Sequence, residues 1–177
     1  MRFLSKRSSL TLLLLTASLL AGCSMLDTAP SAATPAAVPA HDQVAAIRAA
    51  GDREQSIIDV TPLREPGVAD LQNAAKHDEQ TGNYAAAAAK LDQAIKLNPE
   101  SPDLLQDRAE MAIRLKDYTT AEQLAHKSWS LGPKLGPLCA RNWQTIVEMR
   151  LQAKDPSGAD TARKWVQQCH KAGVPRY

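Results

Sequence analysis

Cysteine and histidine, the side chains that most often serve as thiol nucleophiles, catalytic bases and zinc ligands, are few in this sequence: three cysteines and four histidines. Helical metal sites commonly use two histidines four positions apart or a Cys-x-x-Cys pair, and neither spacing occurs in this sequence. Cys169 directly precedes His170, but helical neighbours point about 100° apart, which does not suit a Cys–His nucleophile. The sequence also lacks a glycine-rich phosphate loop and a Gly-x-Ser-x-Gly motif. We therefore predict no catalytic residues, no metal and no cofactor, and we expect a protein that is not an enzyme.

The first cysteine, Cys23, ends a segment that is typical of export signals. Three basic residues precede an apolar run over 10–21. That run is shorter than the roughly 20 residues that span a bilayer. Residues 20–23 read Leu-Ala-Gly-Cys, so small side chains precede a thiol that can carry a thioether-linked lipid. The pattern predicts a signal peptide over 1–22.

The quartet at 20–23 resembles the lipobox of bacterial lipoproteins. The resemblance implies cleavage before Cys23, a diacylglyceryl group on its sulfur and acylation of its new amine by a fatty acid such as palmitate. An aspartate after the cysteine retains many such proteins in the inner membrane. Ser24 stands there in this sequence, so the resemblance implies a lipid anchor in the outer membrane, facing the periplasm. An ordinary signal peptide or an anchor helix with a chance cysteine is the alternative.

The charge balance gives no indication of a nucleic-acid partner. The whole chain carries 21 Lys and Arg against 19 Asp and Glu; without residues 1–22 the balance is 18 to 19. Basic residues are scattered among acidic ones and form no basic stripe. Aromatic residues make up 4% of the chain, which argues against a large aromatic-lined cavity and favours a core of alanine and leucine.

From residue 68 the sequence repeats at a fixed spacing. Tyr84 and Tyr118, each just after a short polar turn, are 34 positions apart. The same spacing relates Leu71 to Leu105, Ala75 to Ala109, Ala87 to Ala121, and Pro99 to Pro133. Each unit is predicted to be a helix, a short turn, a second helix and a proline-containing link.

Residues 68–135 resemble two tetratricopeptide repeats, over 68–101 and 102–135, on the turn with its tyrosine, the central alanine and the closing proline. Residues 136–172 are interpreted as a third, elongated repeat, followed by a tail over 173–177. The resemblance implies an all-α fold, a short superhelical solenoid of about three helix hairpins. Three repeats are about the minimum for a stable solenoid.

Two segments precede the repeats. Residues 23–41, starting with the lipidated cysteine, are rich in alanine and proline and are predicted to be a disordered tether. Asp42 is placed to N-cap a short helix that ends at Gly51. An extended segment over 52–67 should follow and pack against the first repeat, closing its open apolar end, so that 42–67 caps the repeats.

Cys139 and Cys169 form an even pair, which in an oxidising periplasm favours a disulfide. In an antiparallel hairpin centred near residue 154, both lie 15 positions from the turn and therefore face each other. Two buried thiols, or one reactive thiol, are the alternatives.

The tetratricopeptide resemblance implies that a protein partner binds the concave side of the solenoid, which the first helix of each repeat forms; we refer to it as the inner face. By register, the candidate partner-binding residues are Gln72, Lys76, Gln106, Glu110, Arg114 and Gln144. Trp143 is a further candidate, because an amphipathic tryptophan beside polar residues suits an interface. A solvated helix face, or for Trp143 a place in the core, is the alternative.

We thus expect an outer-membrane-anchored periplasmic scaffold or adaptor that binds a protein partner in envelope assembly or in secretion or pilus assembly. A self-assembling structural lipoprotein, and an enzyme with an unrecognised thiol or hydrolytic site, remain as alternatives.

Overall fold

The computed structural model describes residues 41–54 and 64–170. The predicted signal peptide, Cys23, the tether up to residue 40, the segment 55–63 and the predicted tail lie outside the described residues. Within the described ranges the chain forms seven α-helices and no strand: α1 (Gln43–Asp52), α2 (Pro66–Gln80), α3 (Tyr84–Leu97), α4 (Pro102–Arg114), α5 (Tyr118–Leu131), α6 (Pro137–Gln152) and α7 (Pro156–Gln168).

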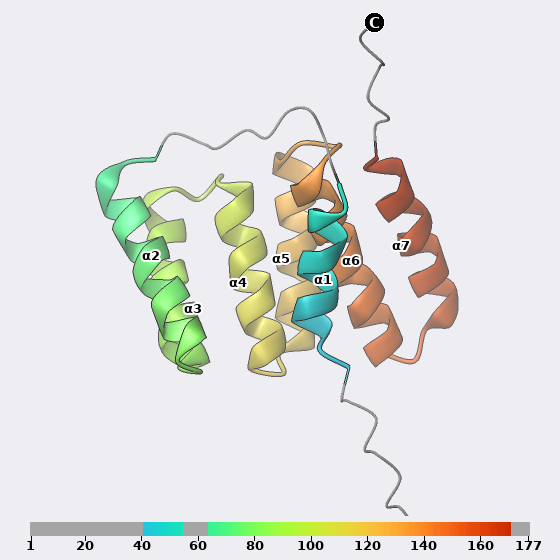
Figure 1. Ribbon diagram of the computed structural model, residues 1–177, viewed down its shortest axis with the longest axis horizontal. Coiled ribbons are helices and arrows are strands. Elements are labelled where there is room, and N and C mark those ends of the chain that lie inside the picture. Colours follow the sequence, from blue (N-terminus) through green and yellow to red (C-terminus); the bar gives the residue numbers. More distant parts are fainter. Residues whose placement is uncertain (1–40, 55–63, 171–177) are drawn as a thin grey trace, which may run out of the picture. The chain divides into compact units, whose positions relative to one another are not determined.

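Six of these helices form three antiparallel hairpins, α2 with α3, α4 with α5, and α6 with α7 (Figure 1). Packing of α3 on α4 and of α5 on α6 joins the hairpins in chain order. The predicted all-α, tetratricopeptide-like solenoid is confirmed. The inner face is formed by α2, α4 and α6.

The turns inside the three hairpins share one geometry, which the local sequence explains. Each turn has one residue with positive φ: Gly82 (79°), Lys116 (64°) or Lys154 (58°). The next residue donates its N–H to the carbonyl five positions back, at 2.8 to 2.9 Å, which closes the preceding helix with a Schellman-type bond. Asp117 and Asp155 then cap α5 and α7 by accepting backbone N–H groups.

Alanines and small residues form the contacts where the helices cross. Ala75, Ala87, Ala109 and Ala121 are all buried, and their short side chains allow close approach of the helices. Large side chains gather where α5 meets the last hairpin, and there Trp129, Trp143 and Trp165 pack in one cluster.

The sequence predicts a short helix at α1 but not the surface on which it packs. The side chain of Asp42 caps it as expected, accepting the N–H of Ala45. α1 packs mainly on α6 and to a lesser extent on α4, so it covers the inner face of the last two hairpins. The reason is an apolar strip there, formed by residues such as Ala112 and Met149, which accepts the apolar side of α1.

Among the described helices, none has the length and continuous hydropathy that crossing a bilayer requires.

Candidate functional site

The inner face is divided by α1 into a covered part and an open part. Val44 and Ile47 of α1 are fully buried against Ala112, Ile113 and Met149 of α4 and α6. Burial of these two side chains removes their apolar surface from water and gives α1 its hydrophobic attachment. The open part lies on the other side of α1, towards α2.

Two arginines meet one buried glutamate beneath α1. Glu110 of α4 is fully buried. Its Oε2 accepts a hydrogen bond from Nε of Arg48 at 2.7 Å, and its Oε1 accepts from Arg141 at 2.6 and 3.0 Å. A buried carboxylate is costly unless it is paired and hydrogen-bonded, and here both oxygens are satisfied. Burial opposes the charged state of both arginines, but the attraction and hydrogen bonds of their two acidic partners together outweigh it. The pKa of Arg48, beside Glu110 and Glu79, and that of Arg141, beside Glu110 and Asp107, are therefore raised.

The same arginines connect the hairpins to one another and to α1. Arg48 also donates to Glu79 of α2 at 2.7 Å, and Arg141 donates to Asp107 of α4 at 2.8 Å. Gln72 of α2 donates to the other oxygen of Asp107 at 2.8 Å. One continuous polar network therefore links α1, α2, α4 and α6.

Further ion pairs hold α1 near its two ends. His41 contacts Glu148 of α6 at 2.8 Å, and Asp42 pairs with Arg114 of α4 at 3.0 Å. Beyond the other end, Glu54 contacts His170, just after α7, at 3.0 Å. α1 is thus anchored on both sides by polar contacts as well as by its apolar side chains.

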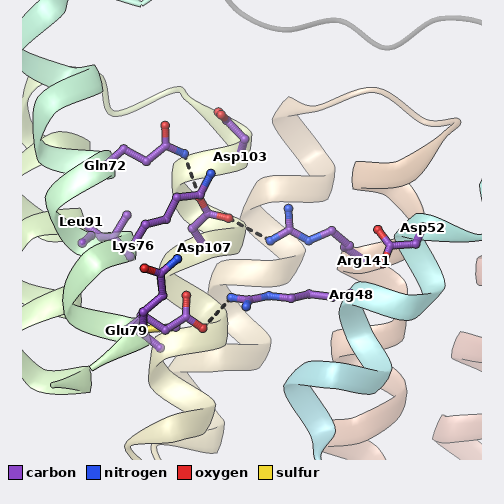
Figure 2. A pocket seen from close by; sticks show the side chains of 12 residues that line it. Arg48, Asp52, Gln72, Lys76, Glu79, Leu91, Asp103, Asp107 and Arg141 are labelled. Atoms are coloured by element: carbon purple, nitrogen blue, oxygen red, sulfur yellow. Dashed lines mark hydrogen bonds and ion pairs between the residues drawn. The ribbon is translucent and has the colours of Figure 1, made fainter. Parts of the chain in front are cut away.

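The open part of the inner face contains a pocket of about 670 Å³ between α1 and α2 (Figure 2). Ala75, Leu91 and Met111 are buried residues that contribute apolar surface to it. Charged and amide side chains form the rest of the lining: Arg48, Asp52, Gln72, Lys76, Glu79, Gln80, Asp103, Asp107 and Arg141.

Two charged side chains of the lining form no ion pair with any residue that the structure describes. Among the residues that the structure describes, Arg48, Glu79, Asp107 and Arg141 are engaged in the network above, and Asp103 pairs with Arg64. Lys76 and Asp52 have no ion-pair partner within the same described ranges. Among the residues of 41–54 and 64–170, the pocket therefore combines an apolar patch with one cation and one anion that have no ion-pair partner.

The predicted partner-binding residues separate into three groups. Gln72 and Lys76 line the pocket. Gln106 and Glu110 are fully buried beneath α1, Arg114 is paired with Asp42, and Gln144 donates to Glu148. The expectation that Gln106 and Glu110 present their side chains to a partner is corrected, because both are fully buried. Arg114 and Gln144 are half-buried, and their part in partner binding stays a prediction.

The expectation that Trp143 binds a partner is also corrected, because its side chain does not lie on the surface. It is 9% exposed and lies in the core between α5, α6 and α7. Its ring stacks on Trp165, with centroids 5.1 Å apart and an interplanar angle of 11°, and meets Trp129 edge-on at 5.3 Å. It therefore supplies bulk to an alanine-rich core.

Sequence reasoning missed Arg48 and Asp107 as parts of the site. The available signal was the amphipathic spacing of Val44, Ile47 and Ala50, which marks α1 as a helix that needs a surface to cover. An arginine next to Ile47 then lies at the edge of the buried side and can reach acidic groups on that surface.

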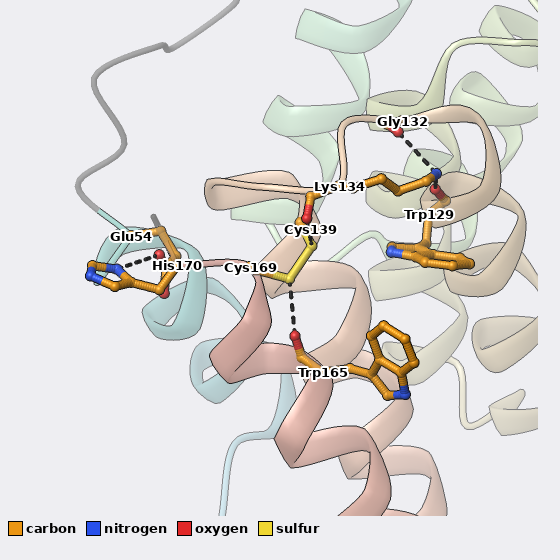
Figure 3. The surroundings of a disulfide bond; sticks show 8 residues. All are labelled: Glu54, Trp129, Gly132, Lys134, Cys139, Trp165, Cys169 and His170. Carbon is orange, nitrogen blue, oxygen red and sulfur yellow. Dashed lines mark hydrogen bonds and ion pairs between the residues drawn. A yellow bond between two sulfur atoms is a disulfide. The ribbon is translucent and has the colours of Figure 1, made fainter. Parts of the chain in front are cut away.

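The predicted disulfide between Cys139 and Cys169 is present (Figure 3). It joins the first turn of α6 to the residue after α7, with the two Cα atoms 5.6 Å apart. The backbone N–H of Gly136 also donates to the carbonyl of Cys169 at 2.8 Å, so the open end of the last hairpin is closed twice.

Comparison with known proteins agrees with this architecture. Residues 80–134, which include α3, α4 and α5, match the tetratricopeptide repeat family model. The solved structure of the globular C-terminal domain of P. aeruginosa LpoP is similar, with a TM-score of 0.56 and 27% sequence identity. That match covers 59% of this chain and 99% of the LpoP domain. A sequence comparison with curated proteins gave no match. Folds of this kind are typical of protein-interaction scaffolds.

Proposed function

We propose that this protein is a lipid-anchored adaptor of the outer membrane, facing the periplasm, which holds a protein partner in the pocket between α1 and α2. The lipobox-like quartet that ends at Cys23, with Ser24 after it, supports the anchor and its location. The repeat architecture supports a protein partner. Envelope assembly and secretion or pilus assembly are the settings in which such an adaptor would act.

The observation that carries the proposal is the lining of the pocket. An apolar patch beside a cation and an anion that are unpaired within the described residues suits a partner segment with one apolar side chain between charged groups. A carboxylate of the partner would pair with Lys76, and a basic side chain with Asp52. The remaining lining is held in place by the arginine network, so the partner meets a preformed surface.

In-cell crosslinking tests the proposal. A photoreactive residue replaces Gln80, an exposed residue of the pocket lining, and the matched control position is Gln123, exposed on α5. We expect one dominant crosslinked protein from position 80 and none from position 123, with identification by mass spectrometry.

Charge reversal then shows whether the pocket itself is responsible. Lys76→Glu should abolish that crosslink, because it places a like charge opposite the partner's carboxylate. Lys127→Glu, an equal change on the exposed side of α5, should leave it intact. Crosslinks only to a second copy of this chain would favour the self-assembling lipoprotein, and crosslinks that persist in Lys76→Glu would place the partner elsewhere.

A further inference from the structure

The surface beneath α1 has the composition of a binding site for a helix. We define the α1 seat as the apolar strip of Ala112, Ile113 and Met149 together with three carboxylates, Glu79, Glu110 and Glu148. These carboxylates come from α2, α4 and α6, one from each hairpin, and converge on α1. The seat is therefore an apolar strip edged with negative charge.

The helix α1 supplies the complement to each part of this seat. Its Val44 and Ile47 cover the apolar strip. Arg48 donates to Glu79 and Glu110, both at 2.7 Å, and His41, two residues before the helix, contacts Glu148 at 2.8 Å. Two apolar residues and a basic one, at positions 44, 47 and 48, account for most of this match.

Most of the seat is organised by contacts that do not involve α1. Oε1 of Glu110 is held by Arg141 at 2.6 Å and by Gln106 at 3.1 Å. Oε1 of Glu148 accepts from Gln144 at 2.9 Å. These partners all belong to α4 and α6, so the two buried carboxylates keep a partner when α1 leaves.

The helix α1 is a short occupant of the seat. It has ten residues, and isolated helices of that length are marginal in water. Val44 and Ile47 are the only large apolar side chains that it buries. Its attachment benefits from the high effective concentration that a covalent connection provides, which a separate helix of the same chemistry lacks.

We propose that the α1 seat is a second partner-binding surface, on which α1 is a built-in ligand that a partner's helix replaces. The occupant that fits is a short amphipathic helix with two apolar residues three positions apart, followed directly by arginine. This inference goes beyond the adaptor function proposed for the pocket, because it concerns the part of the inner face that α1 covers. Local undocking of α1 exposes the seat.

The test uses the full chain and a fluorescent peptide with the sequence of residues 41–54. Ile47→Asp places a charge in the apolar strip and should release α1 from the seat, which hydrogen exchange of the α1 amides verifies. We expect the peptide to bind Ile47→Asp at least tenfold more tightly than the unaltered protein, measured by fluorescence anisotropy. Ala45→Asp, the same new charge on an exposed position of α1, is the control and should behave like the unaltered protein.

The specificity of the seat is tested in the same assay. A peptide carrying Arg48→Glu should bind Ile47→Asp at least tenfold more weakly than the natural sequence. Ile47→Ala removes most of the same contact without adding a charge, and it replaces Ile47→Asp in the assay if that variant fails to fold. It too should bind the natural peptide more tightly than the peptide carrying Arg48→Glu, but by a smaller factor.

The inference is overturned if a folded variant with released α1 does not bind the peptide, or if the unaltered protein binds it equally well. Equal binding of the natural peptide and the peptide carrying Arg48→Glu would contradict the proposal that the seat recognises an arginine. None of these results bears on crosslinking from position 80, so failure of the seat leaves the pocket proposal standing.

Discussion

Gly51 shows how a single residue sets the position of α1. The sequence suggests a glycine that ends the helix, but Gly51 lies inside α1 and is buried. A Cβ atom added there would be 2.8 Å from Cγ of Arg141 and 3.2 Å from the carbonyl oxygen of Pro137. Arg141 cannot yield easily, because it is fixed on Asp107 and Glu110. The absence of a side chain therefore allows α1 to approach α6.

We predict that Gly51→Ala lowers the free energy of unfolding by about 1–3 kcal/mol through overpacking, although alanine favours a helix by about 1 kcal/mol over glycine. Gly67→Ala is the control: Gly67 lies in the first turn of α2, and an added Cβ meets nothing within 4 Å. It should leave stability unchanged or raise it by up to about 1 kcal/mol. Urea unfolding followed by circular dichroism measures both, and a Gly51→Ala protein as stable as Gly67→Ala would contradict the close approach.

At the scale of elements, α7 is a terminal helix that a covalent bond attaches to its neighbour. It is the last helix of the described solenoid and packs chiefly on α6. Only Ala159 and Ala162 are buried along its length, so its apolar contact is small. The disulfide from Cys139 to Cys169 holds its far end and keeps Trp165 stacked on Trp143.

We predict that Cys139→Ser with Cys169→Ser lowers the free energy of unfolding by about 3–4 kcal/mol, the value expected for a closed loop of this length. The corresponding fall in Tm is roughly 10 °C. Thermal unfolding with tryptophan fluorescence is the suitable measurement, because release of α7 exposes Trp143 and Trp165 to water. The unaltered protein in reductant should show the same change; an unaltered Tm in both samples would show that the bond is not structural.

At the scale of the whole molecule, three aspartates at helix starts make stability depend on pH. Asp42, Asp117 and Asp155 cap α1, α5 and α7, and the pKa of each is lowered from the ordinary value of 3.8. The main causes are the backbone N–H of Ala45 for Asp42, the side chain and backbone of Thr120 for Asp117, and the backbone N–H of Gly158 for Asp155. The ionised form is thus favoured in the folded state.

The direction of the pH effect follows from linkage. A carboxyl group whose pKa is lower in the folded than in the unfolded state stabilises the fold above the unfolded value, and this contribution is lost as the pH falls through the folded value. We predict that Tm is nearly constant from neutral pH down to about 5 and falls steeply below about 4. Asp117→Asn with Asp155→Asn should lose less on acidification, because asparagine caps helices without titrating. An equal loss in both proteins would assign acid unfolding to other carboxylates.

Much of the architecture is readable in the sequence because its determinants are local. The 34-residue spacing, the turns near residues 82, 116 and 154, and the proline helix starts act within one hairpin. The pairing of Cys139 with Cys169 is also a local property of one hairpin, because two positions equally far from a hairpin turn face each other. The placement of Gln72 and Lys76 on the inner face also follows from register, and their role in partner binding stays a prediction.

Only the tertiary structure decided which part of the inner face is open. The contacts that place α1 join residues far apart in sequence, by 31 positions for Arg48 with Glu79 and by 107 for His41 with Glu148. No local periodicity encodes such a pair, and an amphipathic helix by itself specifies that it must be covered but not by which surface. The sequence by itself therefore determined the solenoid, while long-range packing decided that α1 covers Gln106 and Glu110 and leaves a pocket beside Lys76.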